Sequence, residues 1–195
     1  MRHQPDKALV RASMLAARRA LSPAARTAAD ASIAGHLAEL VRGCRQVAGY
    51  VPMAGEPGGP ELLPALIAAG PAVLLPILGP DRDLDWARYE GLLVAGPLAG
   101  LAEPPGPRLG PAAVTGADLV LVPALAVDLA GTRLGRGGGS YDRALVRVDP
   151  GTPVVAVLYE TELLSSVPAQ PHDRPVTAVL TPSGLTRLGP GAPMV

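Results

Sequence analysis

The residues best suited to chemistry lie in a glycine-rich stretch, residues 128–143, which reads Asp-Leu-Ala-Gly-Thr-Arg-Leu-Gly-Arg-Gly-Gly-Gly-Ser-Tyr-Asp-Arg. Backbone without Cβ atoms lets N–H groups approach an anion closely, and a helix that begins after the loop adds donors and a favourable dipole. Arg133, Arg136 and Arg143 supply guanidinium groups that suit phosphate or carboxylate oxygens. The stretch therefore predicts a phosphate-binding loop, and a turn that uses glycine only for its geometry is the alternative.

Two familiar nucleotide-binding motifs do not match this stretch. The P-loop ends in Gly-Lys-Ser/Thr, whereas the single lysine of the chain is Lys7. The dinucleotide-binding fingerprint requires a third glycine at the position of Ser140. Anion binding is therefore predicted without either motif.

Two aspartates are candidate magnesium ligands. Asp142 falls in the first turn of the expected helix, where a carboxylate favours the helix dipole and could coordinate Mg²⁺ beside phosphates. Asp173 lies in the turn His172-Asp-Arg-Pro175 and would complete such a site if the fold brings it near Asp142. Helix capping by Asp142 and a surface or hydrogen-bonding role for His172 are the alternatives.

Apolar periodicity and turn residues predict the elements that position these groups. Ser22-Pro23 signals a helix start, and the helical stripe that follows contains Ile33 and Leu37. We expect helices at 7–21, after 23, at 61–69 and from the glycine loop to about 148, and strands at 46–51, 73–78, 84–90, 118–123 and 154–159. Residues 91–113 are expected to wrap the surface irregularly. This alternation predicts one α/β domain over 1–195, with a mostly parallel sheet between helical layers.

Composition excludes several classes of protein. The 17 basic and 17 acidic residues give a formal net charge of zero, which argues against a broad surface for nucleic acid or anionic lipid. The 23 Gly and 23 Pro raise the question of disorder, but the 48% hydrophobic content is enough to build a core. The absence of Phe and the 3% aromatic content make base stacking a weak hypothesis.

Localisation follows from two further features. The single Cys44 cannot form an intramolecular disulfide, so we expect a reducing compartment, the cytoplasm. Residues 62–80 carry no charge and could suggest a membrane span, but proline and glycine interrupt them. A buried helix followed by a buried strand fits this segment better.

Five motifs, in this order along the chain, resemble those of the 5-formyltetrahydrofolate cyclo-ligase family, also called methenyltetrahydrofolate synthetases. They are Lys7-Ala-Leu-Val-Arg11, Tyr50-Val-Pro-Met-Ala-Gly-Glu56, Gly100-Leu-Ala-Glu-Pro104, the loop from Arg133 to Arg143, and Val167-Pro followed by His172-Asp-Arg-Pro175. The resemblance covers nearly the whole chain. It implies a three-layer α/β/α fold and the ATP- and Mg²⁺-dependent closure of 5-formyltetrahydrofolate to 5,10-methenyltetrahydrofolate, ADP and phosphate.

The resemblance also assigns the site residues. Lys7 and Arg11, spaced i and i+4 on one face of the first helix, match ATP-phosphate contacts, although a solvated basic face is the simpler alternative for an arbitrary helix. The expected catalytic residues are Lys7 and Arg136. The remaining ATP contacts are assigned to the nucleotide loop: Arg133, Leu134, Gly135, Arg136, Gly137, Gly138, Gly139, Ser140 and Tyr141.

The folate and metal assignments come from the same resemblance. Glu56 matches the acid that contacts the folate, Val51 lines that pocket, and residues 136–140 border it. Asp142 and Asp173 match the magnesium ligands. We expect a monomer whose partners are 5-formyltetrahydrofolate and ATP, with no nucleic acid or membrane partner. Two functions compete with this one. The first is a folate- or nucleotide-binding module without catalysis, and the second is an α/β relative that binds a phosphosugar or CoA.

Four positions depart from the family pattern. Ser140 stands where a tyrosine is usual before Tyr141, and Val127 replaces a phenylalanine. Gly58 and Gly59 replace the polar or hydroxyl residues that usually follow the acid. Glu103 has a weaker claim to the site than Glu56, and holding a turn is its alternative role.

Overall fold

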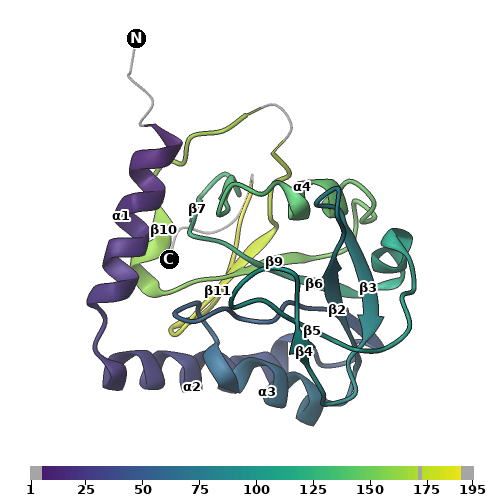
Figure 1. The fold of residues 1–195 in the computed structure, drawn as a ribbon. Helices are drawn as coiled ribbons and strands as arrows, with labels where there is room; N and C mark the ends of the chain where they lie inside the picture. The colour runs from purple at the N-terminus through teal and green to yellow at the C-terminus, as the bar shows by residue number, and fades with distance from the viewer. Residues whose placement is uncertain (1–5, 171–172, 190–195) are drawn as a thin grey trace.

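A seven-stranded sheet forms the centre of the fold (Figure 1). The computed structural model describes residues 6–170 and 173–189. The strand order is β12-β11-β9-β6-β1-β2-β3, in which five neighbouring strands run parallel and the two edge strands run antiparallel to their neighbours. The strands are β1 (Gln46–Ala48), β2 (Ala72–Leu78), β3 (Leu84–Arg88), β6 (Leu119–Pro123), β9 (Val154–Val157), β11 (Ala178–Thr181) and β12 (Gly184–Arg187). The predicted mostly parallel sheet is confirmed.

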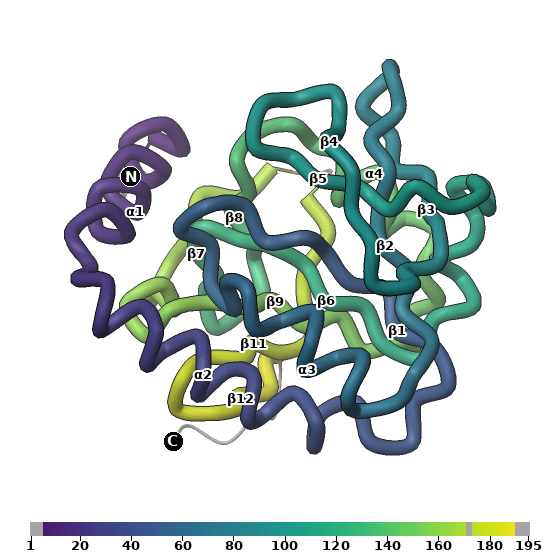
Figure 2. The backbone as a smooth tube through the Cα atoms, turned by 60° about the horizontal axis from the view of Figure 1, so that its bottom comes forward, coloured from purple at the N-terminus to yellow at the C-terminus, as the bar shows by residue number. Residues whose placement is uncertain are grey.

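Helices cover both faces of this sheet. The α-helices are α1 (Lys7–Ala20), α2 (Pro23–Leu40), α3 (Leu62–Ala69) and α4 (Ser140–Leu145), and the 3₁₀ helices are η1 (Gly59–Glu61), η2 (Pro111–Gly116) and η3 (Glu160–Glu162). Helices α2 and α3 pack on one face, as Figure 2 shows, and α4 and η2 pack on the other. The expected three-layer α/β/α architecture is therefore confirmed.

Strand β6 illustrates why a continuous apolar run becomes a central strand. Leu119 and Leu121 pack in the core under α2 and α3, whereas Val120 and Val122 pack in the core under α4. Successive side chains of a strand point to opposite faces, so a strand between two helical layers must be apolar at every position.

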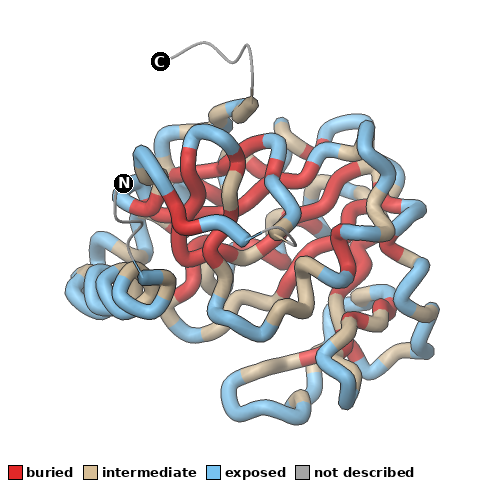
Figure 3. Tube along the Cα trace, turned by 90° about the horizontal axis from the view of Figure 1, so that it is seen from above, coloured by how far each residue is buried: buried red, intermediate tan, exposed pale blue. Residues whose placement is uncertain are grey.

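Helix α1 is an exception to the layered arrangement. Figure 3 shows it as a largely exposed helix beside the buried sheet. Its Val10 and Met14 pack against a small separate core of Ala126, Leu134 and Val167. The side chain of Asp6 caps the helix by accepting from the N–H of Ala8 at 2.9 Å.

The structure corrects several expected boundaries. The first strand was expected to reach Val51 but ends at Ala48, because Tyr50 and Val51 leave the sheet to line a cavity. The helix expected to reach about Val148 ends at Leu145, with Val146 as its C-cap. Residues 91–113 are not wholly irregular, because β4 (Val94–Ala95) pairs with β5 (Ala102–Glu103).

A small second sheet lies beside the glycine loop and was not anticipated. It consists of β7 (Ala126–Asp128), β8 (Arg133–Leu134) and β10 (Leu163–Leu164). The turn between β7 and β8 is closed by the carboxylate of Asp128, which accepts from the N–H groups of Ala130 and Thr132 at 3.1 and 2.9 Å. The strands β11 and β12 were likewise not assigned from the sequence.

The apolar segment 62–80 folds as predicted, into helix α3 followed by strand β2. Within the described residues, no helix combines the length and the apolar character that a membrane span requires.

Candidate active site

A cavity of about 280 Å³ opens at the carboxyl ends of β1, β2 and β6. From β1 the chain proceeds to β2 on one side and later to β6 on the other, so the strand order reverses between β1 and β6. Open α/β sheets bind ligands at such a switch point, because the loops that leave the two strands diverge there. The position of the cavity follows directly from the topology of the sheet.

Helix α1 contributes two cations to one wall of the cavity. Lys7 Nζ lies 2.7 Å from Asp173 Oδ2 and 3.3 Å from Gln170 Oε1. Arg11 Nε donates to the backbone oxygen of Gly135 at 2.9 Å. The helix is therefore joined to the glycine loop and to the segment around Asp173 through the side chains predicted to contact ATP.

The glycine loop folds tightly against these cations. Gly137 and Gly139 adopt left-handed φ values of 102° and 70°, which favour glycine. A Cβ at Gly137 would lie 3.6 Å from Arg11 Cζ, so a side chain there would fill the space beside the guanidinium. The loop leads into α4, which begins at Ser140 with Gly139 as its N-cap.

Arg133 is the buried cation of the loop. Its Nη2 lies 2.6 Å from Asp142 Oδ1, and its guanidinium carbon lies 5.9 Å from the centroid of the Tyr141 ring. Burial, the largest cause, raises the pKa of Tyr141 well above its usual value, and Glu56 raises it further, so the phenol remains protonated. Tyr141 therefore offers the cavity a neutral ring and a hydroxyl.

The opposite wall contains the carboxylate of Glu56. Its Oε2 accepts from the N–H of Met53 at 2.9 Å, and its Oε1 accepts from Arg136 Nε at 2.8 Å. The loop that contains Glu56 is held by Tyr50, whose hydroxyl donates to the backbone oxygen of Pro57 at 2.9 Å. Burial raises the pKa of Tyr50, which stays protonated. Glu56 is thus buried and oriented by donors of the protein itself.

The two glycines after Glu56 have a structural explanation. The N–H of Gly58 donates to Asp30 Oδ1 at 2.9 Å, and a Cβ at Gly59 would lie 2.3 Å from Asp30 Oδ2. Both glycines have positive φ values. A side chain at position 59 would therefore collide with the buried Asp30, and a Cβ at position 58 would lie 2.7 Å from a methyl carbon of Leu62. Gly59 accommodates Asp30, and Gly58 accommodates Leu62.

The two candidate metal ligands lie on the same cavity, each beside a cation. No group of three or more His, Cys, Asp or Glu able to hold a metal ion occurs in the described part of the chain. Two carboxylates nevertheless suit Mg²⁺, which is commonly held by one or two carboxylates together with phosphate oxygens of a substrate. Asp142 and Asp173 fit an ion that arrives with ATP and do not form an all-protein metal site.

The structure gathers every predicted site residue around this one cavity. Lys7, Arg11, Val51, Glu56, residues 133–142 and Asp173 all line it. Leu134 also belongs to the small core under α1. Arg143, grouped with the loop arginines in the sequence, is exposed on α4 and hydrogen-bonds to Gly138. His172 lies outside the described residues.

Several lining residues were missed or underrated in the sequence. Tyr50, Met53 and Gln170 line the cavity but belong to residue types that carry no specific signal alone. Glu103 also lines it and is buried, and its Oε1 accepts from the N–H of Leu78 at 2.8 Å. This carboxylate therefore joins β5 to the end of β2 at the cavity edge.

Comparisons with known proteins agree with one another. Residues 3–182 match the model of the 5-formyltetrahydrofolate cyclo-ligase family. The 5-formyltetrahydrofolate cyclo-ligase of Mycolicibacterium smegmatis is 43% identical over 183 residues, which cover 91% of this chain and 94% of the relative. Among solved structures, the Aquifex aeolicus 5,10-methenyltetrahydrofolate synthetase is 29% identical, with a TM-score of 0.80 over 97% of this chain and 96% of the other. The Mycoplasma pneumoniae enzyme, at 20% identity, shares the fold with a TM-score of 0.74 over 91% of this chain and 99% of its own.

Proposed function

This chain belongs to the 5-formyltetrahydrofolate cyclo-ligase family, and from that membership we propose that it converts 5-formyltetrahydrofolate to 5,10-methenyltetrahydrofolate with consumption of ATP. One observation carries the proposal. The residues matched to ATP, to folate and to magnesium come from separate parts of the sequence and line a single cavity.

The proposed chemistry activates a poor electrophile. A formamide carbon resists attack because its nitrogen donates electrons to the carbonyl group. Transfer of the γ-phosphoryl group of ATP to the formyl oxygen releases ADP and leaves an N5 iminium phosphate. N10 then attacks the activated carbon and loses its proton, and the C–O bond breaks to release phosphate. Such a reaction needs positioning and positive charge more than a protein nucleophile.

The cations on α1 and the glycine loop are proposed to bind the phosphates of ATP. Before ligand arrives, Lys7, Arg133 and Arg136 each face a carboxylate: Asp173, Asp142 and Glu56 respectively. These carboxylates hold the cations around the cavity and neutralise their mutual repulsion. A polyphosphate supplies stronger acceptors, so Lys7 can transfer its hydrogen bond to a phosphate oxygen without leaving the site. Arg136, whose side chain is 43% exposed and which pairs with Glu56, is proposed to lie between the two substrates.

The carboxylates released from these pairs are proposed to hold the metal. Asp142 and Asp173 would ligate Mg²⁺ together with phosphate oxygens. When bound, the ion would screen the negative charge of the phosphates during transfer. Lys7 and Arg133 would move from carboxylate to phosphate as ATP binds, and Asp173 would keep the hydrogen bond from the N–H of Gln170 that orients it.

Glu56 is proposed to orient the folate. Two of its donors come from the protein, Met53 N–H and Arg136 Nε. A carboxylate has about four lone-pair sites, so it can accept further hydrogen bonds from the N–H groups at the polar edge of the pterin. Val51 and Met53 supply apolar surface beside it. The bound ring would then face the glycine loop, as in-line transfer requires.

A direct assay tests the proposed function. Purified protein with ATP, Mg²⁺ and 5-formyltetrahydrofolate should form methenyltetrahydrofolate, followed by its near-ultraviolet absorbance, with one ADP per product. Reactions without ATP or with EDTA should form none. If calorimetry detects bound folate and ATP but no product forms, the chain is a binding module. If CoA or sugar phosphates raise the melting temperature and ATP with folate does not, the site serves a different ligand.

The compartment and assembly are part of the same proposal. We infer a cytoplasmic monomer acting as a single domain, supported by the lone Cys44 and by one cavity that contains all the assigned residues. Gel filtration with light scattering should give one mass, near the 19.8 kDa of the chain.

A further inference from the structure

A buried ion pair lies outside the cavity and is not used by the proposed chemistry. Arg18 Nε and Nη2 donate to Glu162 Oε1 and Oε2 at 2.6 and 2.9 Å, which is a two-bond arrangement. Both side chains are buried, with 4% and 2% of their surface exposed. Burial lowers the pKa of Arg18, but the hydrogen bond and charge of Glu162 outweigh burial and raise it overall, so the guanidinium stays charged.

Arg18 is the buried contact between α1 and the main fold. Every residue of α1 is described by the structure, and Arg18 is the one that is buried. Lys7, Arg11 and Arg18 lie at i, i+4 and i+11, which places all three along one stripe of the helix. The same face therefore carries the predicted ATP contacts at one end and the buried attachment at the other.

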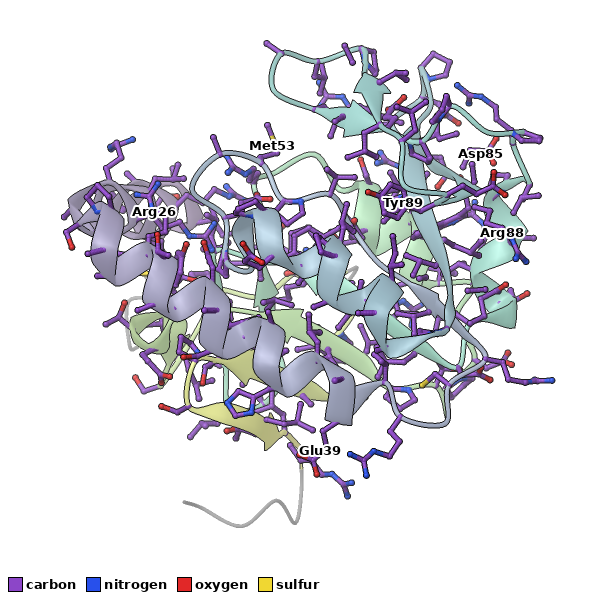
Figure 4. All side chains as sticks on the ribbon, turned by 90° about the horizontal axis from the view of Figure 1, so that it is seen from below. Arg26, Glu39, Met53, Asp85, Arg88 and Tyr89 are labelled. Atoms are coloured by element: carbon purple, nitrogen blue, oxygen red, sulfur yellow. The ribbon has the colours of Figure 1, made fainter. Side chains whose placement is uncertain are left out.

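This attachment connects α1 to the wall of the cavity. Arg18 Nη2 also donates to the backbone oxygen of Ala124, which follows β6 and lines the cavity. Glu162 belongs to η3 and accepts from the N–H of Tyr159 at 3.0 Å. On α2, Arg26, labelled in Figure 4, donates to the backbone oxygen of Arg18 at 2.9 Å. Three elements of the main fold thus hold one residue of α1.

Because Lys7 lies far from Arg18 along α1, a small tilt of the helix at Arg18 changes the position of Lys7. Lys7 is 11 positions before Arg18, about 16 Å along a helix. A tilt of about 5° at Arg18 would displace Lys7 by roughly 1.4 Å over that length. Misplacement of a positioning group by about 1 Å can cost on the order of 10²-fold in rate. The other contacts of α1 are the packing of Val10 and Met14 and the part-buried hydrogen bonds of Lys7 and Arg11, so Arg18 is its most deeply buried contact.

We propose that Arg18 and Glu162 are positioning residues, whose buried two-bond contact fixes α1 against the end of β6 and thereby places Lys7 and Arg11 over the phosphates of ATP. This inference rests on the proposed function for its catalytic consequence, but the attachment of α1 can be measured without turnover. Neither residue contacts a substrate in this account. They act through the helix.

The test uses the double variant Arg18→Met/Glu162→Leu in the full chain. Replacing a buried ion pair by apolar side chains of similar volume is often close to neutral for stability. The variant also removes the partners of the Ala124 oxygen and the Tyr159 N–H, so the melting temperature should fall by several degrees while the protein still folds. The value of kcat/KM for ATP should fall about ten- to a hundredfold, while KM for 5-formyltetrahydrofolate stays within about threefold because Glu56 is held by contacts that the variant leaves intact. Amide hydrogens of α1 should exchange at least about tenfold faster, with those of α2 unchanged.

Two further variants separate positioning from general stability. Arg19→Met removes an exposed arginine from the same helix and should match wild type in every measurement. Arg18→Lys keeps the charge, loses the two-bond geometry, and should give an intermediate loss of kcat/KM for ATP. If the double variant does not fold, this single variant decides the matter.

Each remaining outcome has a defined meaning. The proposal would be overturned if the folded double variant kept the wild-type kcat/KM for ATP and the wild-type amide exchange of α1. If the double variant does not fold, the same result in Arg18→Lys would overturn it. An equal loss in Arg19→Met would overturn it as well. If the wild-type protein forms no product, the proposed function fails, whereas the exchange of α1 amides still establishes or refutes the attachment by Arg18 and Glu162.

Discussion

The two walls of the cavity are built on opposite principles. On the wall proposed to bind phosphate, the phosphate wall, Lys7 and Arg136 are 18% and 43% exposed, and they belong to an outlying helix and a glycine loop. On the wall proposed to bind folate, the folate wall, Glu56 is 5% exposed, and its loop is closed over the buried Tyr50 and Asp30. On the phosphate wall, Lys7 faces an aspartate that a phosphate could replace, whereas on the folate wall Glu56 is held by the backbone N–H of Met53 as well as by Arg136. The difference suits a reaction in which one ligand is transferred and the other is held.

Removing the cation of the phosphate wall should have the largest effect. Lys7→Ala should lower kcat by about 10²- to 10³-fold, because one charge that stabilises the transferring phosphoryl group is lost. Its ion pair with Asp173 is partly exposed, so the free energy of unfolding should change by less than about 1 kcal/mol. Steady-state kinetics and thermal unfolding measure both quantities, with the exposed Arg19→Ala as the control on the same helix. Full activity in Lys7→Ala would remove this residue from the mechanism.

The rigid folate wall should be the more sensitive of the two to backbone strain. Gly59→Ala places a methyl group 2.3 Å from Asp30 Oδ2 at a left-handed φ and should cost about 2–3 kcal/mol of unfolding free energy. Gly70→Ala, also left-handed but with open space around it, should cost only about 1 kcal/mol. Urea unfolding of both variants gives the difference. Equal losses would show that Asp30 yields easily and that this wall is not rigid.

A change in the folate wall should alter KM for 5-formyltetrahydrofolate and leave KM for ATP nearly unchanged. Glu56→Gln replaces an acceptor that faces two donors with an amide that must turn an NH₂ group towards one of them. KM for 5-formyltetrahydrofolate should rise about tenfold or more, with KM for ATP within about threefold. Glu61→Gln, an exposed acid in the following 3₁₀ helix, is the control. A rise confined to KM for ATP would reverse the assignment of the two walls.

The metal requirement should depend on the phosphate wall alone. Asp142→Asn removes a carboxylate charge from the proposed Mg²⁺ site, so the Mg²⁺ concentration for half-maximal rate should rise about five- to tenfold. KM for the folate should not change. Asp149→Asn, an exposed position after α4, serves as the matched control. Identical magnesium titrations for Asp142→Asn and wild type would count against the role given to this carboxylate.

The smallest effect is expected for the stability contributed by the ion pair between Arg147 and Asp83, next to α4. Arg147, just after α4, hydrogen-bonds to Asp83 and lowers the pKa of that carboxyl below its usual 3.8, mainly through this hydrogen bond. Because the folded-state pKa is the lower one, the stabilisation exists above the unfolded-state pKa and is lost as the pH falls through the folded-state value. Asp83→Asn should therefore cost up to about 1 kcal/mol at pH 7 and nothing well below the folded-state pKa.

Urea unfolding of this variant at neutral and strongly acidic pH provides the measurement. Glu90→Gln, an exposed acid beyond β3, should show no such pH dependence. A loss for Asp83→Asn that is equal at both pH values would mean that its ion pair with Arg147 does not supply the stabilisation.

The secondary structure was predictable where the signal was local. The apolar run of β6 and the Ser22-Pro23 start of α2 occur as expected, because each depends on residues within a few positions. The hairpin of β7 and β8 was missed because its turn depends on the carboxylate of Asp128, which also accepts from the N–H of Val167 at 3.0 Å. No periodicity reveals an acceptor shared between segments 39 positions apart.

The site was predictable as a set of residues but not as a set of contacts. The family motifs named every residue that was assigned to the cavity, from Lys7 to Asp173. They did not indicate that Arg136 pairs with Glu56 across 80 positions, or that Asp30 lies where a side chain at Gly59 would have to go. Arg18 and Glu162 had no signal at all, since an arginine in an arginine-rich helix resembles its exposed neighbours.

The sequence by itself determined the local chemistry: a glycine loop that can approach an anion, one lysine spaced one helical turn from Arg11, and apolar runs that had to become buried strands. The tertiary structure decided which charges meet. It brings Lys7 to Asp173 across 166 positions and Arg18 to Glu162 across 144. The physical reason is that helix and strand preferences act over a few neighbouring residues, whereas these contacts depend on the order of strands, which places β1 between β2 and β6.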